Sequence, residues 1–395
     1  MREEFGFMYK VKLLNNIKSP ELERLCGTKY AVSAEHEDSD AIIVRSAKLH
    51  DEKFSEDLLC IARAGAGVNN IPLERCADEG IVVFNTPGAN AQGVVELALC
   101  GLFLSTRNII GGVEWVKSVA DKGDEVAALV EKQKAQYVGP EIFGKTLAVI
   151  GLGAIGAKIA NSASLLGMKV MGYDPYMSEA AAKGLLSGVT KVDDLDKIYK
   201  EADFISLNLP YMESTKHFIS QATIAKMKQG VRIINMARAE LVCDDGILSA
   251  LESGHVACYV TDFPNGRIAG AAGVVPIPHL GASTPESEDN CVAMACDEII
   301  EYLENGNIIN SVNLPAANLP RSGTSRLCVI YKSEADMAEK LSSAISGLGG
   351  DIKEILNASK PNAHSYIIVE LNKAPENLED AVKAVDGVIR VRVLP

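Results

Sequence analysis

The sequence is poor in aromatic residues and carries fewer positive than negative charges. Aromatic residues make up 5% of the 395 residues, whereas there are 33 glycines. These proportions are expected where Val, Ile, Leu and Ala fill a parallel sheet that is covered by helices. The 39 Lys and Arg against 52 Asp and Glu give a formal net charge of −13. This charge disfavours nonspecific binding to nucleic acid or anionic lipid, so an anionic ligand must be bound by a local site.

Signals for export, for a membrane span and for a metal site are also missing. The nine cysteines are odd in number and contain no Cys-x-x-Cys pair, which predicts neither a disulfide framework nor a zinc site. Glu3 and Glu4 lie where a secretory signal needs positive charge, and no uninterrupted apolar run reaches roughly 18 residues. We therefore expect a cytoplasmic protein with no metal and no membrane segment.

The chain alternates short β-rich runs with helical segments, which is typical of βαβ units and doubly wound parallel sheets. At about 150 residues per domain, the length predicts two or three domains. Residues 94–104 are apolar over too great a length for a strand and indicate a buried helix. The capping-box pattern from Ser283 to Glu286 predicts a helix to about residue 304. The predicted parallel strands are residues 11–14, 41–44, 81–84, 147–150, 169–173, 203–208, 231–235, 256–261 and 274–277.

The last part of the chain has a different order of elements. Residues 325–395 alternate as strand, helix, strand, strand, helix, strand, which is the order of a ferredoxin-like unit. Residues 317–324 contain Pro320 and Gly323 and are interpreted as a linker before it. The sequence therefore predicts an α/β protein with a small C-terminal domain.

The strongest local motif is a glycine-rich turn between a predicted strand and a helix. Gly151 permits a tight turn, Gly153 lets the backbone approach a pyrophosphate, and Gly156 lets helix and strand pack closely. Eighteen residues beyond Gly156, after the next predicted strand, Asp174 can accept hydrogen bonds from a ribose and repel a 2′-phosphate. The motif favours NAD over NADP. The alternative is an ordinary glycine-rich turn with Asp174 as a solvated loop residue.

Two further residues carry chemistry that an acidic substrate needs. Arg238 follows the predicted strand 231–235, at the edge where open α/β sheets bind ligands, and its guanidinium can bind a carboxylate through two hydrogen bonds. His279 lies between Pro278 and Gly281, which suits a ring that exchanges a proton with a substrate. Taken alone, Arg238 could be a surface arginine and His279 a structural imidazole.

Together with the glycine motif, these residues resemble the D-isomer-specific 2-hydroxyacid dehydrogenase family over nearly the whole chain. The C-terminal unit resembles an ACT regulatory domain. The segments that carry the resemblance are 63–71, Asn85-Thr86-Pro87-Gly88, Val94-Val95-Glu96-Leu97-Ala98, the glycine motif, Asn208-Leu209-Pro210, and the segments around Arg238 and His279.

The resemblance implies a specific architecture. Residues 1–93 and 284–316 would form a flavodoxin-like substrate-binding domain, and residues 94–283 a Rossmann domain for NAD that is inserted into it. Residues 317–324 would be the linker and residues 325–395 an ACT-like regulatory or oligomerisation domain. The family's active site lies in the cleft between the first two domains.

The resemblance also implies residue roles. Arg238 would bind the carboxylate and polarise the C2 oxygen, and His279 would exchange the hydroxyl proton as hydride moves between C2 and the nicotinamide. The segment with Arg45 and Ser46 is similar to the one that binds phosphate in phosphoglycerate-specific members, although a surface-arginine role stays open for Arg45. The substrate carboxylate would also meet the backbone of Ala66, Gly67 and Val68. Further cofactor contacts would come from Val94, Ala154, Ile155, Asn208, Leu209, Pro210 and Ala237.

The sequence departs from the family at two places. Members usually orient the histidine with a Glu, but aligned on Phe263 this position falls on Gly266. We expect Asp262 or a shifted loop to supply the missing acid and to act with Arg238 and His279 in catalysis, because a carboxylate raises the imidazolium pKa and fixes its tautomer. Residues 330–335 lack the Asn and Pro-Gly turn common in effector-binding ACT domains, which argues against feedback inhibition by serine.

The resemblance implies NAD-dependent oxidation of D-3-phosphoglycerate to 3-phosphohydroxypyruvate, the first step of L-serine biosynthesis. One alternative is a dehydrogenase for another small D-2-hydroxyacid, such as glycerate or a hydroxypyruvate-related substrate. A second alternative is a non-catalytic NAD-binding regulatory protein, which the missing Glu makes conceivable. The family also implies a homodimer or homotetramer that binds a small phosphorylated 2-hydroxyacid and neither nucleic acid nor membrane.

Overall fold

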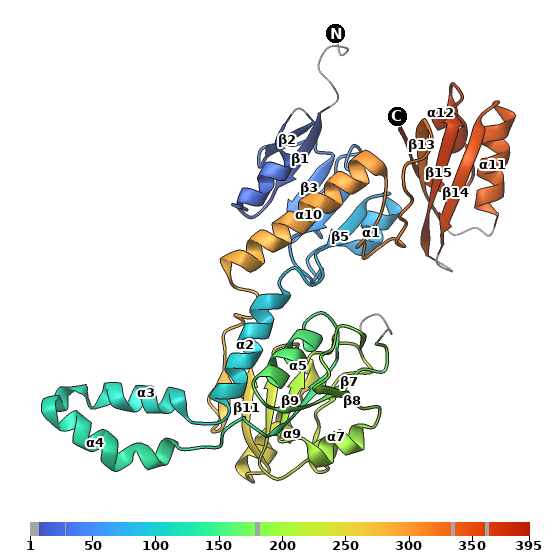
Figure 1. Ribbon diagram of the computed structural model, residues 1–395. Coiled ribbons are helices and arrows are strands. Elements are labelled where there is room, and N and C mark those ends of the chain that lie inside the picture. Colours follow the sequence, from blue (N-terminus) through green and yellow to red (C-terminus); the bar gives the residue numbers. More distant parts are fainter. Residues whose placement is uncertain (1–7, 28, 178–181, 333–335, 360–362) are drawn as a thin grey trace. The chain divides into compact units, whose positions relative to one another are not determined.

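The computed structural model describes residues 8–395 apart from residue 28 and residues 178–181, 333–335 and 360–362 (Figure 1). The chain divides into two compact units, one of Met1–Asn90 with Glu288–Pro395 and one of Ala91–Ser287. The C-terminal residues that we expected as a separate domain are grouped with the first unit. Within the segment 330–335, where the sequence departs from effector-binding ACT domains, residues 333–335 lie outside the described residues.

The first unit contains a five-stranded parallel sheet. Its strand order is β2 (Tyr30–Ser33), β1 (Tyr9–Leu13), β3 (Ala41–Val44), β4 (Cys60–Arg63) and β5 (Val82–Asn85). This is the 2-1-3-4-5 order of flavodoxin-like folds, whose ligands bind where the strand order reverses. The reversal lies at the carboxyl ends of β1 and β3, so the residues that follow these strands form the candidate substrate edge.

Both faces of this sheet are covered, which explains why its central strand β3 is apolar and buried at every position. Ala41 and Ile43 pack into a core with helix α10 (Pro285–Asn305), whereas Ile42 and Val44 pack into a second core on the opposite face. Short helices complete the layers: η1 (Pro20–Leu25) and α1 (Leu73–Asp78). Parallel sheets need such cover because an open face would leave their continuous apolar runs in water.

The predicted capping box of α10 is corrected in its register. The helix begins at Pro285, so Thr284 is the residue before it, and its Oγ1 accepts a hydrogen bond from the Ser287 N–H at 3.0 Å. The Ser283 hydroxyl instead donates to the His279 carbonyl at 3.3 Å. Proline at the first helical position moves the cap one residue along the chain, because proline favours the first turn and lacks an N–H.

The C-terminal part of the first unit is a four-stranded antiparallel sheet with two helices on one face. The strand order is β14 (Asp351–Ala358), β15 (His364–Lys373), β13 (Ser325–Lys332) and β16 (Val388–Leu394), and the helices are α11 (Met337–Gly347) and α12 (Leu378–Lys383). This βαββαβ arrangement is the ferredoxin-like unit that the sequence predicts, and its helical face has a core of its own.

The other face of this sheet packs into the core of the five-stranded sheet. Cys328, Ile330 and Tyr366 share a buried cluster with residues of α10. Arg392 donates hydrogen bonds to the carbonyls of Tyr302 and Leu303, at 3.0 and 2.8 Å. These carbonyls belong to the last turn of α10, where backbone acceptors lack helical partners and positive charge is favourable.

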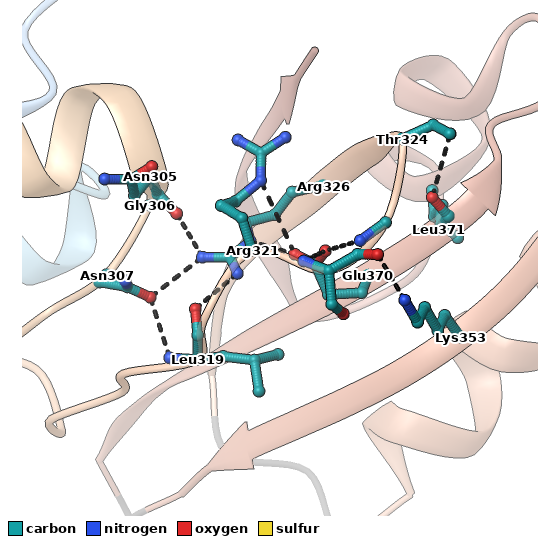
Figure 2. A network of polar contacts seen from close by, with 12 residues as sticks. Asn305, Gly306, Asn307, Leu319, Arg321, Thr324, Arg326, Lys353, Glu370 and Leu371 are labelled. Carbon is teal, nitrogen blue, oxygen red and sulfur yellow. Dashed lines mark hydrogen bonds and ion pairs between the residues drawn. The ribbon is translucent and has the colours of Figure 1, made fainter.

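A buried ion pair joins the four-stranded sheet to the segment that precedes it (Figure 2). Arg326 and Glu370 are both fully buried and pair through the arginine Nε. The guanidinium also donates to the Asn305 carbonyl, to Asn307 Oδ1 at 3.0 Å and to the Leu319 carbonyl at 2.6 Å. Both terminal nitrogens of this buried guanidinium thus donate to the last residue of α10 and to the segment that follows it, at Asn307 and Leu319.

The carboxylate of the pair fixes the same segment from the other side. Glu370 Oε2 accepts hydrogen bonds from the N–H groups of Ser322 and Gly323, the former at 2.8 Å. Burial raises the pKa of the Glu370 carboxyl. These N–H groups and Arg326 lower the pKa by more than burial raises it, so the pKa lies below its usual range. Residues 317–324, which we interpreted as a linker, are therefore anchored at several points.

The second unit contains a seven-stranded parallel sheet with the doubly wound order of dinucleotide-binding domains. The order is β12 (Val274–Pro276), β11 (Val256–Thr261), β10 (Val231–Asn235), β9 (Phe204–Leu207), β6 (Thr146–Ile150), β7 (Lys169–Tyr173) and β8 (Val189–Lys191). Its helices include α2 (Ala91–Leu104), α5 (Gly156–Leu165), α7 (Leu195–Glu201), α8 (Gln221–Ile224) and α9 (Asp244–Glu252). The strand order reverses between β6 and β9, which places the glycine motif at the reversal. The predicted α/β fold class is confirmed.

A helical extension leaves the second unit after α2. It consists of α3 (Ile109–Ser118), η2 (Ala120–Glu125), α4 (Val126–Gln133) and η3 (Lys134–Tyr137), none of which has a buried residue. Figure 1 shows these helices extending away from the sheet of their own unit. In the described chain no single helix could span a membrane; α2 and α3 meet the length and composition criteria only as a pair bent by 70°, and α2 belongs to the core.

Replacing Arg326 with Met is expected to lower the free energy of unfolding by about 3–5 kcal/mol, because it leaves the Glu370 charge buried without its partner. Since the folded-state pKa of Glu370 is lowered, its contribution is present above the unfolded pKa of about 4.3 and is lost as the pH falls through the folded value. The deficit of the variant should therefore shrink in acid. Urea unfolding followed by circular dichroism at pH 7 and pH 4 measures both effects.

The matched control is Lys383→Met, which breaks an exposed pair with Glu379 on α12. It should leave the unfolding curve nearly unchanged, because exposed helix pairs contribute little. An Arg326→Met curve that overlays the Lys383→Met curve at pH 7 would contradict the role assigned to the buried pair.

Candidate functional site

The three glycines after β6 have three different physical roles. Gly151 has a φ of +88°, which favours glycine. A Cβ on Gly156 would lie 1.9 Å from the Gly151 carbonyl oxygen, so this position must lack a side chain for the loop to close. A Cβ on Gly153 would meet no protein atom within 4 Å. The absence of a side chain at Gly153 therefore serves no packing inside the unit and leaves room for a ligand.

The same loop offers backbone donors to an anion. Among the described contacts, the N–H groups of Gly153, Ala154 and Ile155 have no hydrogen-bond acceptor, and they precede the first turn of α5. Free N–H groups at the start of a helix form a site for phosphate groups. This is the position that the sequence predicts for the pyrophosphate of a dinucleotide.

Asp174 lies beside the glycine loop, at the end of β7. Its Oδ2 accepts a hydrogen bond from the Leu152 N–H and its Oδ1 accepts one from the Tyr176 N–H, each at 2.9 Å. These bonds hold a carboxylate next to the loop with lone pairs to spare. Such a group accepts ribose hydroxyls and repels a 2′-phosphate, which fits NAD.

The residues after β9 approach the glycine loop from the neighbouring strand. The Asn208 N–H donates to the Ile150 carbonyl at 2.8 Å, and a Cβ on Gly151 would lie 2.6 Å from the Asn208 carbonyl oxygen. Leu209 is half-buried and Pro210 is exposed. The structure thus brings this predicted segment to the loop.

Val94, which is a predicted cofactor contact, lies on the inner face of α2. It is buried in the core between α2 and the sheet, and it packs near Gly281. Its position on the inner face of a long apolar helix explains this burial. The remaining predicted cofactor residue, Ala237, is half-buried and lies in the turn after β10.

A buried asparagine shapes the turn that presents Arg238. Asn235 Oδ1 accepts hydrogen bonds from the N–H groups of Ala237 and Arg238, at 3.1 and 3.3 Å, and its Nδ2 donates to the Arg238 carbonyl at 2.8 Å. The Arg238 side chain is exposed and donates to the Ala237 carbonyl at 2.6 Å. Its guanidinium carbon lies 5.8 Å from the centre of the Phe263 ring.

His279 is held in an unusual backbone conformation with an exposed ring. Its φ is +55°, its N–H donates to the Ile277 carbonyl at 3.0 Å, and its imidazole centre lies 4.7 Å from the Phe263 ring centre. A positive φ costs a non-glycine residue strain that the surroundings must compensate. Arg238 and His279 therefore both contact Phe263, and the second unit brings these two predicted residues to one aromatic ring.

Asp262 compensates that strain through the main chain. Its side chain is 1% exposed, and its two oxygens accept hydrogen bonds from the N–H groups of Leu280 and Gly281, at 2.7 and 2.8 Å. Among the described residues of this unit no carboxylate is hydrogen-bonded to the His279 ring. The bond from Asp262 to the imidazole that we expected is absent, because both oxygens are taken by the two residues that follow His279.

The alternative of a shifted loop is not supported either. The loop after Phe263 turns toward α9, where Asn265 Nδ2 donates to Asp244 at 3.0 Å and Arg267 pairs with Asp245. A Cβ on Gly266 would meet nothing within 4 Å. The position that carries Glu in the family is thus an exposed turn that is fixed to another helix.

The first unit has a basic pocket at the carboxyl ends of β3 and β4. Its volume is about 420 Å³, and its lining residues are Arg45, Ser46, Lys48, His50, Arg63, Asn69 and Asn70. Val44 pairs with Arg63 in the parallel register, which brings two stretches of chain 19 residues apart to one edge. The pocket is positive in a chain of net charge −13, so it suits an anion.

Hydrogen bonds hold the loops of this pocket in place, and the guanidinium of Arg45 already has a carboxylate partner. Asn15 Oδ1 accepts hydrogen bonds from the backbone N–H groups of Arg45, Ser46 and Ala47. The Arg63 Nε donates to the Arg45 carbonyl at 3.1 Å. The Arg45 guanidinium itself pairs with Glu288 at 2.7 Å, so a phosphate there would have to compete with a carboxylate.

Backbone donors lie in the loop between β4 and the pocket residues Asn69 and Asn70. Asn85 Nδ2 donates to the Ala66 carbonyl at 2.7 Å and the Ile71 N–H donates to the Val68 carbonyl at 3.1 Å, which fixes the loop. In the described contacts, the N–H groups of Ala66, Gly67 and Val68 have no acceptor. Three free N–H groups in one loop can bind a carboxylate.

Sequence reasoning missed several residues of these two sites. Lys48 and Arg63 are part of the basic pocket, but the sequence analysis did not predict the strand that ends at Arg63 and so gave no reason to place the two residues together. Asn235 could have been found as a polar residue at the end of a buried strand. Among the described residues, no group of three or more His, Cys, Asp or Glu is placed to hold a metal ion.

Similarity to known proteins agrees with this geometry. A family model for the NAD-binding domain of D-isomer specific 2-hydroxyacid dehydrogenases matches residues 104–281. D-3-phosphoglycerate dehydrogenase of Bacillus subtilis is 34% identical over 286 residues, which are 70% of this chain and 52% of that protein. Hydroxypyruvate reductase of Thermotoga maritima is 36% identical over 261 residues, which are 63% of this chain and 80% of that protein. The chain spans about half the length of the curated D-3-phosphoglycerate dehydrogenases that it matches.

Solved structures give the same result. The NAD⁺-bound 3-phosphoglycerate dehydrogenase of Entamoeba histolytica matches with a TM-score of 0.60 and 25% identity, over 78% of this chain and 99% of that chain. The holo D-mandelate dehydrogenase of Rhodotorula graminis matches with a TM-score of 0.64 and 25% identity, over 78% of this chain and 98% of that chain. The predicted cofactor, NAD, is confirmed by the family's NAD-binding domain and by the NAD⁺-bound neighbour. By these similarities, and by the glycine loop and sheet order that it shares with dinucleotide-binding domains, the chain belongs to the D-isomer-specific 2-hydroxyacid dehydrogenase family.

Proposed function

We propose that this protein is an NAD-dependent dehydrogenase that oxidises D-3-phosphoglycerate to 3-phosphohydroxypyruvate, and that it supplies L-serine biosynthesis. The basic pocket of the first unit is the observation that favours a phosphorylated substrate, because its arginines and lysine suit a phosphate better than a neutral group. The D-3-phosphoglycerate dehydrogenases among its relatives support the same substrate.

The residues of the glycine loop, Asp174 and the segment after β9 would hold NAD. When bound, NAD supplies a nicotinamide ring that accepts hydride from the C2 carbon of a 2-hydroxyacid. The free N–H groups of the loop would bind its phosphates, and Asp174 would accept hydrogen bonds from its ribose.

The chain's own chemistry would come from two exposed side chains of the second unit. Arg238 would bind the substrate carboxylate with two parallel hydrogen bonds and stabilise charge on the C2 oxygen. His279 would accept the proton of the C2 hydroxyl through a ring nitrogen and return it in the reverse direction. Asp262 would act on this step by fixing the His279 backbone rather than by touching the ring.

Two other functions remain as alternatives. A dehydrogenase for an unphosphorylated D-2-hydroxyacid, such as glycerate or hydroxypyruvate, is favoured by the hydroxypyruvate reductase of Thermotoga maritima, most of whose length the chain covers. A non-catalytic NAD-binding regulatory protein is favoured by the absence of an acid bonded to the His279 ring in the described part of its unit.

The ion pair between Arg45 and Glu288 gives a test of the substrate. NADH oxidation is measured with phosphohydroxypyruvate and with hydroxypyruvate. Arg45→Ala should raise the KM for phosphohydroxypyruvate roughly 10- to 100-fold, as expected for a lost charge-assisted hydrogen bond. Glu288→Gln should lower the same KM about two- to fivefold, because it removes an exposed carboxylate that competes with the phosphate. Neither variant should change the KM for hydroxypyruvate.

The control for this test is His279→Gln, which should bind NADH but lose roughly 10²- to 10⁴-fold in kcat. Equal effects of Arg45→Ala on both substrates would favour the unphosphorylated alternative. NADH binding without turnover of either substrate by the unmodified protein would favour the regulatory alternative.

We further propose that the protein is a homodimer or homotetramer in which a second copy covers the helical extension, and that the C-terminal ACT-like unit has a structural role. The extension has no buried residue, yet one stretch of α3 exposes Ile109, Ile110, Val113 and Val116. This spacing places apolar side chains on one face of a helix, which is expected at an interface.

For the ACT-like unit, the observation that supports a structural role is that both faces of its central strands are buried.

Ile110→Glu should shift the protein toward monomer in analytical ultracentrifugation at micromolar concentration, because it places a charge in the apolar stripe. Leu165→Glu is the matched control, since Leu165 is also exposed but lies at the end of α5 outside the extension. A monomeric unmodified protein, or an Ile110→Glu variant that associates like the control, would contradict this assembly.

A further inference from the structure

The side chain of Phe263 is held at the edge where the candidate catalytic residues lie. Its N–H donates to the Thr261 Oγ1 at 3.1 Å, at the last residue of β11. The preceding residue, Asp262, donates its N–H to the Asn235 carbonyl at the end of β10. Phe263 is therefore fixed to the ends of two neighbouring strands, while its ring is half-buried.

One ring contacts both side chains that would act on the substrate. The imidazole of His279 lies 4.7 Å from the Phe263 ring, centre to centre, with the planes at 52°. The guanidinium carbon of Arg238 lies 5.8 Å from the same ring centre. Tilted rings at this distance attract each other, and a cation within about 6 Å of an aromatic ring is attracted to its face.

These contacts matter because both partners otherwise lack side-chain support in their unit. The only hydrogen bond of the Arg238 side chain in the described contacts goes to its own neighbour, the Ala237 carbonyl. The His279 ring has no hydrogen-bond partner there, since Asp262 uses both oxygens on the backbone. An exposed side chain without such a partner samples several rotamers, which a catalytic group must not do.

We propose that Phe263 is a positioning residue for the hydride-transfer reaction, and that its ring orients the His279 imidazole and the Arg238 guanidinium where the family uses an acid to orient the histidine. This inference rests on the proposed function. Asp262 fixes the backbone of the loop that carries His279, and Phe263 orients the imidazole ring of His279. These two residues are adjacent and follow the end of β11.

The test compares Phe263→Leu, Phe263→Tyr and Phe218→Leu with the unmodified protein. Leu retains an apolar side chain but has no aromatic face, whereas Tyr retains the ring. Phe218 is the matched control, because it is also half-buried in the second unit but packs against the core cluster around Ile219 and Ile224, and no ring or cation contact joins it to Arg238 or His279 in the described contacts. The measurements are kcat and KM for the 2-oxo acid substrate with NADH, NADH affinity by fluorescence, and thermal unfolding.

Phe263→Leu should lower kcat by about tenfold or more, because loss of orientation by an ångström costs up to about 100-fold. Its KM for the 2-oxo acid should also rise, since Arg238 loses support, whereas the NADH dissociation constant should stay within about twofold of the unmodified value because the glycine loop is untouched. Phe263→Tyr should restore kcat, and Phe218→Leu should leave it unchanged. A merely structural role would not give rescue by Tyr with unchanged NADH binding.

A second measurement does not depend on how well the Leu variant folds. The imidazole proton resonances of His279, assigned with His279→Gln, should show a ring-current shift in the unmodified protein and in Phe263→Tyr. Full activity of Phe263→Leu, equal losses in the Leu and Tyr variants, or no ring-current shift would overturn the inference while the unmodified protein still turns over a 2-oxo acid. An unmodified protein that oxidises no NADH with any 2-oxo acid would instead overturn the proposed function, and this inference with it.

Discussion

Ligand binding in the proposed function depends on backbone N–H groups at the carboxyl ends of parallel strands. Every ligand expected here is an anion, and the chain carries a net charge of −13. A parallel sheet directs the ends of all its strands to one edge, and the loops that follow them present N–H groups and helix starts there. In the described contacts, the second unit presents free N–H groups in the glycine loop and the first unit presents them in the loop at Ala66–Val68. Few side-chain cations are needed, and they are concentrated at Arg238 and in the basic pocket around Arg45.

The same edge shows what holds the histidine loop, although no carboxylate is bonded to the His279 ring among the described residues of the second unit. A carboxylate partner would stabilise the imidazolium and fix the tautomer. Here the carboxylate of Asp262 is buried and serves the backbone after His279, which has a strained positive φ. Orientation of the ring is left to the aromatic contact with Phe263. The conformational constraint is retained, but the electrostatic stabilisation of the imidazolium by a bonded carboxylate is not.

Much of the fold could be predicted, because hydrophobic alternation and turn residues act locally. The glycine turn could be recognised in the sequence, since Gly151 and Gly156 each satisfy a constraint within a few residues of chain. The hydrogen-bond partners of Asp262 could not be predicted, because they depend on the path of a loop 18 residues away. The basic pocket was missed in part because Lys48 and Arg63 come together only through strand register.

The most direct test of backbone anion binding is the affinity of Gly153→Ala for NADH, measured by fluorescence titration beside its thermal unfolding. A methyl group at Gly153 meets no protein atom, so the variant should unfold at the same temperature as the unmodified protein. It should nevertheless bind NADH at least about tenfold more weakly, because the methyl group occupies the space that a pyrophosphate needs. Unchanged NADH affinity with unchanged unfolding would contradict the account.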